Sequence, residues 1–435
     1  MNLHFTKTTL ANGLDVIVHS DRHAPIVAVS VWYHVGSKNE RPGQTGLAHL
    51  FEHLMFEGSE HAPEGFFGPL QRAGASINGS TSTDRTNYYE IVPRGALELA
   101  LWMEADRMGW LLPALTEARF NTQRDVVLNE RRQSYENKPY GLASFAIHDG
   151  LYPPDHPYHW PTIGAPADLR AATVDDARAF FSRCYHPANA SLAIAGDIGE
   201  DEAVQLAASV FEEIPAGVPV PALTNIPPGE SRVRHLLIED RVEHPRLYLA
   251  WATPALFTTD DAELDLVADL LANGKTSRLY RRLVHEQRIA TELAASQGSR
   301  ELSSLFQIVA TAAPGHTLAE IEVVILAEIA RLVADGPSPD ELQRGQVQSE
   351  AAFLHRLQTA GGFGGKSDQL NAYNIYRGTP DYFQTDLERY LSATTEGVRM
   401  AAGRWLRPEA RLTLSVVPRG RAGLAIDGAV PSEVS

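Results

Sequence analysis

The 435-residue chain has very little cysteine, with Cys184 as its one thiol. A single cysteine excludes both an internal disulfide and a metal site built from several thiolates. An isolated cysteine is more often a small buried apolar residue than a nucleophile, and we expect a buried role for Cys184.

Long apolar runs are also missing. No stretch approaches the roughly 18 consecutive apolar residues that indicate a membrane-spanning helix. The first residues, Met1 to Lys7, include neither a long apolar core nor a cleavage-like end, so the sequence predicts no signal peptide. We therefore expect no membrane span and a cytoplasmic protein, with the periplasm as the alternative if a signal peptide was removed.

Positive charge is in deficit, because 38 lysines and arginines face 54 aspartates and glutamates, a net charge of −16. This balance argues against binding to nucleic acid or to acidic membrane surfaces, and weakly favours basic peptides. The glycine-rich run 361–365 lacks the strand-to-helix setting of a phosphate-binding loop, which argues against a nucleotide site.

What the chain does contain is the run His49-Leu50-Phe51-Glu52-His53, which has the order H-x-x-E-H. On a helix, His49 and His53 are one turn apart and project from the same face. Two such imidazoles can bind one zinc ion, and Glu52 beside them can reach a water molecule without taking a metal position.

The flanking residues predict where this helix begins and ends. Thr45 is a candidate N-cap, and Gly58 is a candidate glycine just past the C-terminus. The alternative interpretation is an ordinary buried amphipathic helix with incidental histidines. We favour the metal site, because two histidines and a glutamate on an apolar helix are costly without a partner.

A zinc site needs a further protein ligand, and residues 119–135 read as a second helix that could supply it. Glu130 lies in this stretch, but Glu117 and Glu136 are close by, and spacing alone does not choose among them. A second metal site at His148, His156 and His159 is a weaker alternative to capped turns and packing contacts.

Taken together, these motifs resemble the pitrilysin/insulysin/mitochondrial-processing-peptidase family of inverzincin zinc metallopeptidases. The resemblance covers nearly the whole chain and fits the zinc-bearing subunit of the bacterial two-domain type. It rests on residues 46–53, 76–82, 86–89, 124–130 and 156–164.

The resemblance implies a set of site residues. One zinc ion per chain would be bound by His49, His53 and Glu130, with Glu52 as the catalytic residue that activates water. Relatives often have another glutamate shortly before the third ligand, where this chain has Gln123. An amide can support the ligands by hydrogen bonding but cannot carry charge, so a carboxylate role at that position is in doubt.

The resemblance also implies how a peptide substrate is bound. Residues 75–91 read as two short strands, and in relatives the strand with an Asn-Ala pair adds the substrate as an extra strand. The corresponding pair here is Asn78 and Gly79. The alternative is an ordinary edge strand with a turn at these two residues.

The chain reads as two copies of one unit. Residues 183–196 and 404–417 both show a helix end, a proline turn and a strand, and strand pairs near 14–33 and 236–252 also correspond. We expect an α+β fold with two homologous domains, each a mainly antiparallel sheet covered by helices on one side. The predicted parts are a catalytic zinc-binding domain at 1–214, a proline-rich linker at 215–229 and a non-zinc domain at 230–435.

The second copy is expected to bind no zinc. Matching Gly58 to Gly274 sets Asp265 opposite His49, Ala268 opposite Glu52 and Asp269 opposite His53. One copy would then be catalytic, and the other structural or substrate-handling.

Active relatives also have an arginine and a tyrosine that contact the substrate, in the second half or in a partner subunit. Here Val284 and Thr291 occupy those places, and neither can replace a guanidinium or a phenol. We therefore predict a heterodimer in which a homologous non-zinc subunit supplies the pair. The alternative is a homodimer that works without it.

The sequence thus predicts a zinc endopeptidase or oligopeptidase that hydrolyses peptides held in a chamber between two subunits. Two alternatives belong to other functional classes. One is a non-catalytic core subunit of a processing-peptidase-like complex, and the other is a peptide-binding clamp that has no need of Glu52.

Overall fold

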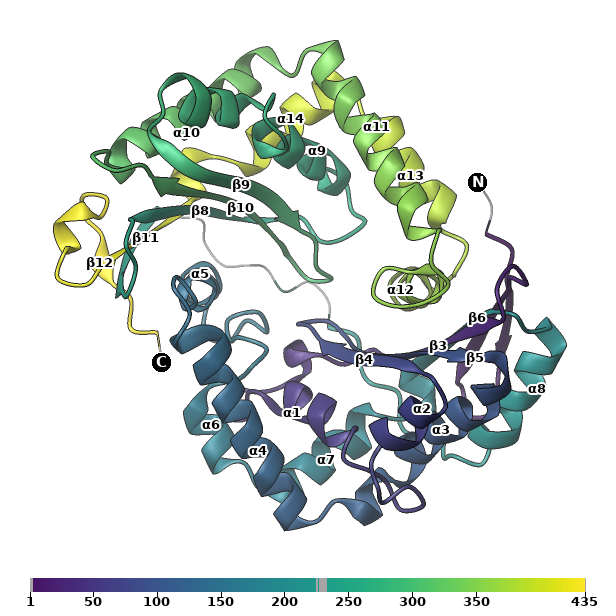
Figure 1. Cartoon of the computed structure of the whole chain (residues 1–435). Helices are drawn as coiled ribbons and strands as arrows, with labels where there is room; N and C mark the ends of the chain where they lie inside the picture. The colour runs from purple at the N-terminus through teal and green to yellow at the C-terminus, as the bar shows by residue number, and fades with distance from the viewer. Residues whose placement is uncertain (1–2, 224–225, 227–232, 435) are drawn as a thin grey trace. The chain divides into compact units, whose positions relative to one another are not determined.

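The structure is a computed structural model that describes residues 3–223, 226 and 233–434. The chain forms two compact units, each built around a six-stranded mixed sheet (Figure 1). Both units are discontinuous in sequence. Unit 1 takes in Met1–Glu130, Trp160–Ala222 and Ala352–Thr385, and unit 2 takes in Arg131–His159, Leu223–Ala351 and Asp386–Ser435.

The sheet of unit 1 has the strand order β1-β2-β6-β3-β5-β4. The bounds are Thr6–Thr9 for β1, Asp15–Ser20 for β2, Ala190–Gly196 for β6, Ile26–Tyr33 for β3, Thr86–Pro93 for β5 and Ser76–Thr81 for β4. β2 and β6 are parallel, and the other neighbouring pairs are antiparallel. The short strand β4 is therefore at an edge of the sheet.

Helices cover both faces of this sheet. α1 (Leu47–Leu54), α3 (Leu97–Ala114) and α8 (Glu200–Phe211) pack on one face, and α12 (Lys366–Arg377) packs on the other (Figure 1). Consecutive side chains of β3 point to opposite faces of the sheet. Trp32 Nε1 donates to Asp368 Oδ1 of α12 over 2.8 Å, whereas the Tyr33 ring packs against Tyr88 and Tyr185 on the other side.

Four further helices belong to unit 1, apart from Arg131 at the end of α4. They are α2 (Phe67–Arg72), α4 (Glu117–Arg131), α6 (Pro166–Ala171) and α7 (Val174–Cys184). The thiol of Cys184 is free and buried, as expected for an apolar packing role.

The sheet of unit 2 has the order β12-β7-β11-β8-β10-β9, in which the last five strands repeat the plan of unit 1 and the edge strand β12 differs from β1 in direction. The bounds are Val430–Pro431, Arg234–Asp240, Leu412–Pro418, Arg246–Thr253, Ser304–Ala312 and Ala290–Gly298, in that order. β7 is parallel to both β11 and β12, and the remaining pairs are antiparallel. The topology shared by five strands of each sheet confirms the predicted α+β fold of two similar, mainly antiparallel domains.

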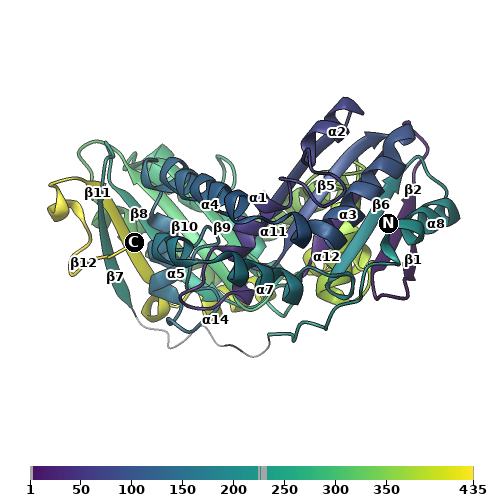
Figure 2. The same cartoon turned by 90° about the horizontal axis from the view of Figure 1, so that it is seen from below.

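Helices again cover both faces. α9 (Asp261–Ala272), α10 (Leu318–Asp335) and α14 (Thr395–Trp405) share one apolar core (Figure 1). α5 (Ala143–Leu151) packs on the opposite face against β7, β8 and β11 (Figure 2). The other long elements are α11 (Pro339–Arg356), α13 (Phe383–Leu391) and the π-helical turns Arg132–Glu136 and Tyr280–Glu286. Short 3₁₀ turns occur at Ser37–Asn39, Arg94–Ala96, Pro187–Asn189, Pro408–Ala410 and Ala422–Leu424.

The prediction that helices cover each sheet on one side is therefore wrong. All residues of β6 are buried, which requires cover on both faces. In each unit that cover includes a helix from the other half of the sequence, α12 in unit 1 and α5 in unit 2. The compact units consequently differ from the contiguous domains 1–214 and 230–435.

The predicted linker 215–229 lies partly outside the described residues. Its described residues, 215–223 and 226, form neither helix nor strand. Among the helices of the described chain, none combines the length and apolar character needed to cross a membrane.

Candidate metal centre

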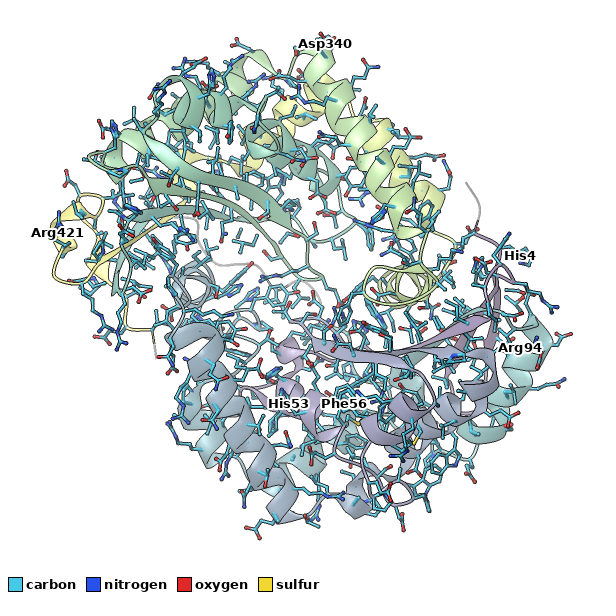
Figure 3. The ribbon with its side chains drawn as sticks, in the orientation of Figure 1. His4, His53, Phe56, Arg94, Asp340 and Arg421 are labelled. Atoms are coloured by element: carbon cyan, nitrogen blue, oxygen red, sulfur yellow. The ribbon has the colours of Figure 1, made fainter. Side chains whose placement is uncertain are left out.

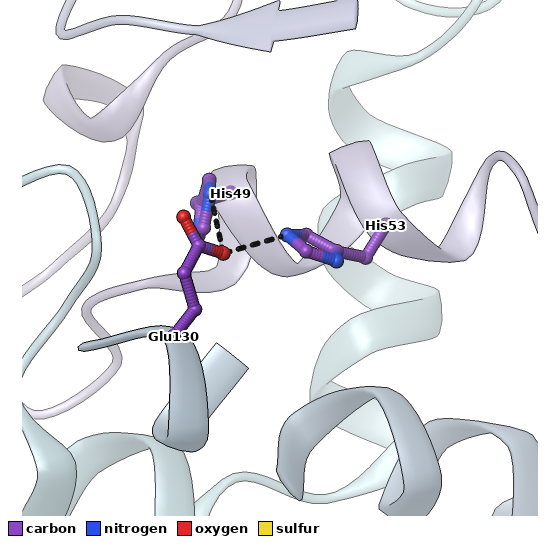
Figure 4. A group of neighbouring side chains, drawn as sticks. All are labelled: His49, His53 and Glu130. Atoms are coloured by element: carbon purple, nitrogen blue, oxygen red, sulfur yellow. Dashed lines mark ion pairs between the residues drawn. The ribbon is translucent and has the colours of Figure 1, made fainter. Parts of the chain in front are cut away.

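Two helices of unit 1 bring the predicted ligands together. His49 and His53 project from α1 with their rings 4.9 Å apart, and Glu130 lies in the last turn of α4 (Figure 4). Glu130 Oε2 is 3.7 Å from His49 Nε2 and 3.2 Å from His53 Nε2. Within the described residues, this is the one group of three or more His, Cys, Asp or Glu side chains whose ligand atoms all lie within 4.8 Å.

The donor set fits a zinc ion of the catalytic kind, which takes three protein ligands and keeps a fourth position open. Zinc bonds of about 2.1 Å at tetrahedral angles place ligand atoms about 3.4 Å apart, close to the two distances from Glu130. Burial, helped by the charge of His53, lowers the pKa of His49 to about 4. Its imidazole is therefore neutral near pH 7, the form that binds metal.

Glu52 is held beside this cluster by the edge strand. Its carboxylate accepts a 2.7 Å hydrogen bond from the Thr81 hydroxyl at the end of β4. Burial raises the pKa of Glu52, while the hydrogen bond from Thr81 acts in the opposite direction. The structure thus places a carboxylate next to the ligands but outside the ligand group.

The start of α1 is fixed by a residue that the sequence analysis missed. The two carboxylate oxygens of Glu40 accept backbone N–H bonds from Gly46 and Ala48 over 2.9 and 2.8 Å. Burial raises the pKa of Glu40 to about 8, although both N–H donors favour the carboxylate form. The sequence offered one signal for this role, an acidic residue a few positions before the helix. That signal does not reveal which N–H groups the carboxylate binds.

The predicted N-cap is wrong. Gly46 occupies that position with φ of 93°, a backbone conformation that glycine adopts readily. Thr45 instead donates to Asp168 Oδ2 over 2.7 Å and accepts the Ala165 N–H over 2.9 Å. These bonds join the start of α1 to the start of α6.

The predicted C-terminal glycine is also wrong, because α1 ends at Leu54 and Met55 is its C-cap. Gly58 lies farther on, in a loop where its φ is 115°. Phe56 lies between these two points, and Figure 3 labels it together with His53.

Gln123 lies two helical turns before Glu130 on α4. Its amide donates to Glu57 Oε1 over 2.6 Å. This hydrogen bond joins α4 to the segment that follows α1, and its acceptor is not one of the candidate metal ligands. A supporting role for Gln123 would therefore act through the distance between α4, which carries Glu130, and the segment that follows α1.

Asn78 and Gly79 lie within β4, where they pair with Tyr89 and Tyr88 of β5. The alternative of a turn at these residues is wrong, since the hairpin closes through Ser82 and Arg85 over 2.9 Å. Asn78 is exposed and Gly79 is buried. A Cβ on Gly79 would lie 3.0 Å from the Tyr88 ring and 3.1 Å from the Phe56 ring.

The other candidate ligands have different partners. His148 Nε2 lies 2.7 Å from Arg300 Nη1, His156 Nδ1 accepts the Tyr158 N–H, and His159 Nδ1 lies 2.9 Å from the Tyr152 carbonyl oxygen. Glu136 accepts from Arg131 over 3.0 Å, and Glu117 begins α4 at the end far from Glu130.

In unit 2, α9 takes the topological place of α1, since both helices follow an equivalent strand and contact the edge strand of their sheet. Asp265 there accepts a 2.7 Å bond from the Tyr390 hydroxyl, and Asp269 accepts a 3.1 Å bond from the Asn273 amide. Burial raises the pKa of Asp265 to about 7. Both aspartates thus accept side-chain hydrogen bonds at the positions that correspond to the two histidines.

Comparison with known proteins identifies the family. Residues 15–152 match the family described as insulinase (peptidase family M16), and residues 171–348 match the peptidase M16 inactive domain. The zinc protease PqqE of Helicobacter pylori is 30% identical over 391 residues, which span 88% of this chain and 87% of that protein. The chain belongs to peptidase family M16. The predicted family resemblance is confirmed.

Solved structures agree with the family assignment. A protease from Helicobacter pylori superimposes with a TM-score of 0.87 at 27% identity, over 95% of this chain and 99% of that one. A peptidase M16 inactive domain from Pseudomonas fluorescens has the same fold, with a TM-score of 0.81 at 20% identity over 96% and 98% of the two chains. In this M16 chain the candidate ligands His49, His53 and Glu130 all lie in the insulinase-matching segment.

Proposed function

We propose that this M16 protein is a zinc-dependent peptidase whose metal ligands are His49, His53 and Glu130. The observation that carries the proposal is the ligand group itself, with its atoms within 4.8 Å and Glu52 one residue before His53. This combination supplies three ligands, an open position and a nearby base, which metal-assisted hydrolysis requires.

When bound, a zinc ion supplies Lewis acidity, which polarises a peptide carbonyl and makes water easier to deprotonate. The chain's own contribution to proton transfer comes from Glu52. Its carboxylate accepts a proton from water and then delivers that proton to the nitrogen of the leaving amine. Thr81 orients the carboxylate for both transfers through its hydrogen bond.

The peptide substrate is proposed to lie along the edge strand β4, at Asn78 and Gly79. β4 pairs with β5 on one side and ends the sheet on the other. An added strand gains affinity from main-chain hydrogen bonds, which are independent of the peptide sequence. Because Thr81 belongs to the same strand, peptide binding and the orientation of Glu52 depend on one element.

The arginine–tyrosine pair is proposed to come from a homologous non-zinc subunit, so that the active form is a heterodimer enclosing the peptide. Val284 is half-buried and packs against the apolar core of unit 2, and Thr291 lies on β9. Neither residue can supply a guanidinium or a phenol. A homodimer without the pair is the alternative, and the cytoplasm is the expected compartment, with the periplasm as the alternative.

A non-catalytic core subunit is the second candidate function. One observation favours it, because residues 171–348 match a domain described as inactive. That match contains none of the three candidate zinc ligands, so it is also what a catalytic chain with one zinc-binding half would show.

The substitution Glu52→Gln tests the proposal. It keeps the size of the side chain and removes the base, so we expect bound zinc to stay at one per chain and cleavage of unstructured peptides to fall about 10²- to 10⁴-fold. Glu64→Gln is the matched control, because Glu64 is 79% exposed. Cleavage by Glu52→Gln at the wild-type rate would contradict the proposal.

A further inference from the structure

A cavity of about 420 Å³ lies in unit 1 between α3 and α8, separate from the metal centre. Trp102 and Trp110 of α3 line it, together with Val210 and Glu213 at the end of α8 and His61 from the loop after α1. Its volume is within the range of small-molecule pockets. Nothing in the proposed peptidase mechanism uses these residues.

Two tryptophan side chains line this cavity. Eight residues of helix place their Cα atoms roughly 12 Å apart. Trp110 leaves helical geometry, with φ of −126° and ψ of 23°, and its carbonyl oxygen accepts the Glu60 N–H over 3.0 Å. The kink precedes Pro113, which has no N–H to continue the helix. Trp102 remains 39% exposed, so its indole is accessible from solvent.

The imidazole in the cavity is also held in place. Asp106 is buried, and its carboxylate binds His61 Nδ1 over 2.5 Å, the His61 N–H over 3.3 Å and the Ser59 hydroxyl. The His61 ring then packs edge-on against Trp110, with ring centroids 5.6 Å apart. The charge of a protonated His61 is offset by Asp106.

The other charged groups at the cavity are acidic. Glu213 lines the cavity, Glu60 lies close enough to act on His61, and the residues lining the cavity include no lysine or arginine. This balance disfavours an anion. A cation gains from the carboxylate and from the faces of the indoles, and a planar guanidinium gains most because it stacks on aromatic rings and pairs with a carboxylate.

We propose that this cavity binds the side chain of an arginine carried by a peptide, with its guanidinium between the tryptophans and Glu213. The site would hold a basic residue of a polypeptide away from the metal centre. Binding here requires neither zinc nor Glu52, so the inference stands or falls independently of the peptidase proposal.

The test uses the full chain with ¹⁵N-labelled tryptophan and the probe N-acetyl-arginine methylamide. Trp102→Phe and Trp110→Phe assign the two indole N–H signals among the six tryptophans. We expect saturable shifts of these two signals. The neutral, nearly isosteric citrulline compound should bind at least about fivefold more weakly, because it lacks the charge that pairs with Glu213.

Two neighbouring glutamates provide matched variants. Glu213→Gln should weaken binding of the arginine probe about fivefold, whereas Glu212→Gln should leave it unchanged, since both residues are exposed but only Glu213 lines the cavity. Thermal melting checks that each variant is folded. Equal binding of the two probes, equal effects of the two variants, or shifts confined to other indoles would overturn the proposal.

Discussion

The hydroxyl of Thr81 donates a 2.7 Å hydrogen bond to Glu52 Oε2. This bond joins the end of the edge strand β4 to the helix that carries His49 and His53. The strand proposed to bind the peptide therefore also fixes the carboxylate proposed to act as base. Loss of the hydroxyl should affect the chemical step more than the binding of metal.

Thr81→Val removes the hydroxyl and nearly preserves the shape of the side chain. We expect kcat for peptide cleavage to fall roughly 2- to 10-fold, the loss that corresponds to one hydrogen bond, with zinc content and KM unchanged. Thr81→Ser keeps a hydroxyl and should restore most of the rate. Steady-state kinetics together with zinc analysis measures these changes. A wild-type kcat for Thr81→Val would exclude a role of Thr81 in orienting Glu52.

Glu40→Ala removes both acceptors from the start of α1. The N–H groups of Gly46 and Ala48 would then be buried without partners, at a cost of about 1–3 kcal/mol each. We expect a lower free energy of unfolding in urea and faster loss of zinc to a chelator. Glu64→Ala, at an exposed position, is the control. Equal stability of the two variants would contradict this account of how α1 begins.

Gly79→Ala tests the packing of the edge strand. The added Cβ would lie 3.0 to 3.1 Å from two aromatic rings, so Phe56 or Tyr88 must move. Overpacking of this kind costs about 1–3 kcal/mol, measured as a shift of the urea midpoint. Asn78→Ala, at an exposed neighbour on the same strand, should change stability by less than about 0.5 kcal/mol. An unchanged urea midpoint for Gly79→Ala would contradict this expectation, because the Phe56 and Tyr88 rings would then move aside at little cost.

The loss of stability of unit 2 as the pH falls should depend on Glu341. Its carboxylate binds Arg278 through two bonds of 2.8 and 2.7 Å, and the arginine lowers the pKa of Glu341 from 4.5 to about 2. A carboxyl whose pKa is lower in the folded state contributes stability above its unfolded value and loses it as pH falls through the folded value.

The difference in unfolding free energy between wild type and Glu341→Gln should therefore be constant above about pH 5 and shrink between pH 4.5 and 2. Urea unfolding of both proteins at several pH values measures it. A difference that stays constant down to pH 3 would show that the pair with Arg278 does not set the pKa.

Local patterns were sufficient to predict much of the fold. The predicted strands near residues 26–33 and 247–252 occur as β3 and β8, because apolar residues in short runs between turn residues fit buried strands. The spacing of His49 and His53 likewise implies a shared helix face. These features depend only on neighbours in the sequence.

Long-range partners could not be predicted in this way. Glu130 competes with Glu117 and Glu136 until the fold brings one of them to the histidines, and only the family resemblance favoured it. The cap that Glu40 provides and the bond from Thr45 to Asp168 join segments whose proximity no local pattern encodes.

The exchange of helices between the two halves was missed for a related reason. α12 carries Asp368, Asn371 and Asn374, residue types that are mostly exposed in proteins, yet all three are buried against the first sheet. Their polar groups are satisfied there by partners such as Trp32 and Ser30. Hydrophobic periodicity cannot reveal a buried face that is polar.

The most direct test of the central claim is peptide cleavage by the purified chain, measured together with its zinc content before chelation, after chelation and after zinc is restored. The account predicts one zinc per chain and, for the chain alone or with its homologous subunit, cleavage that is lost and regained with the metal. Cleavage that persists in zinc-free protein would contradict it, as would full zinc binding after His49, His53 and Glu130 are replaced together.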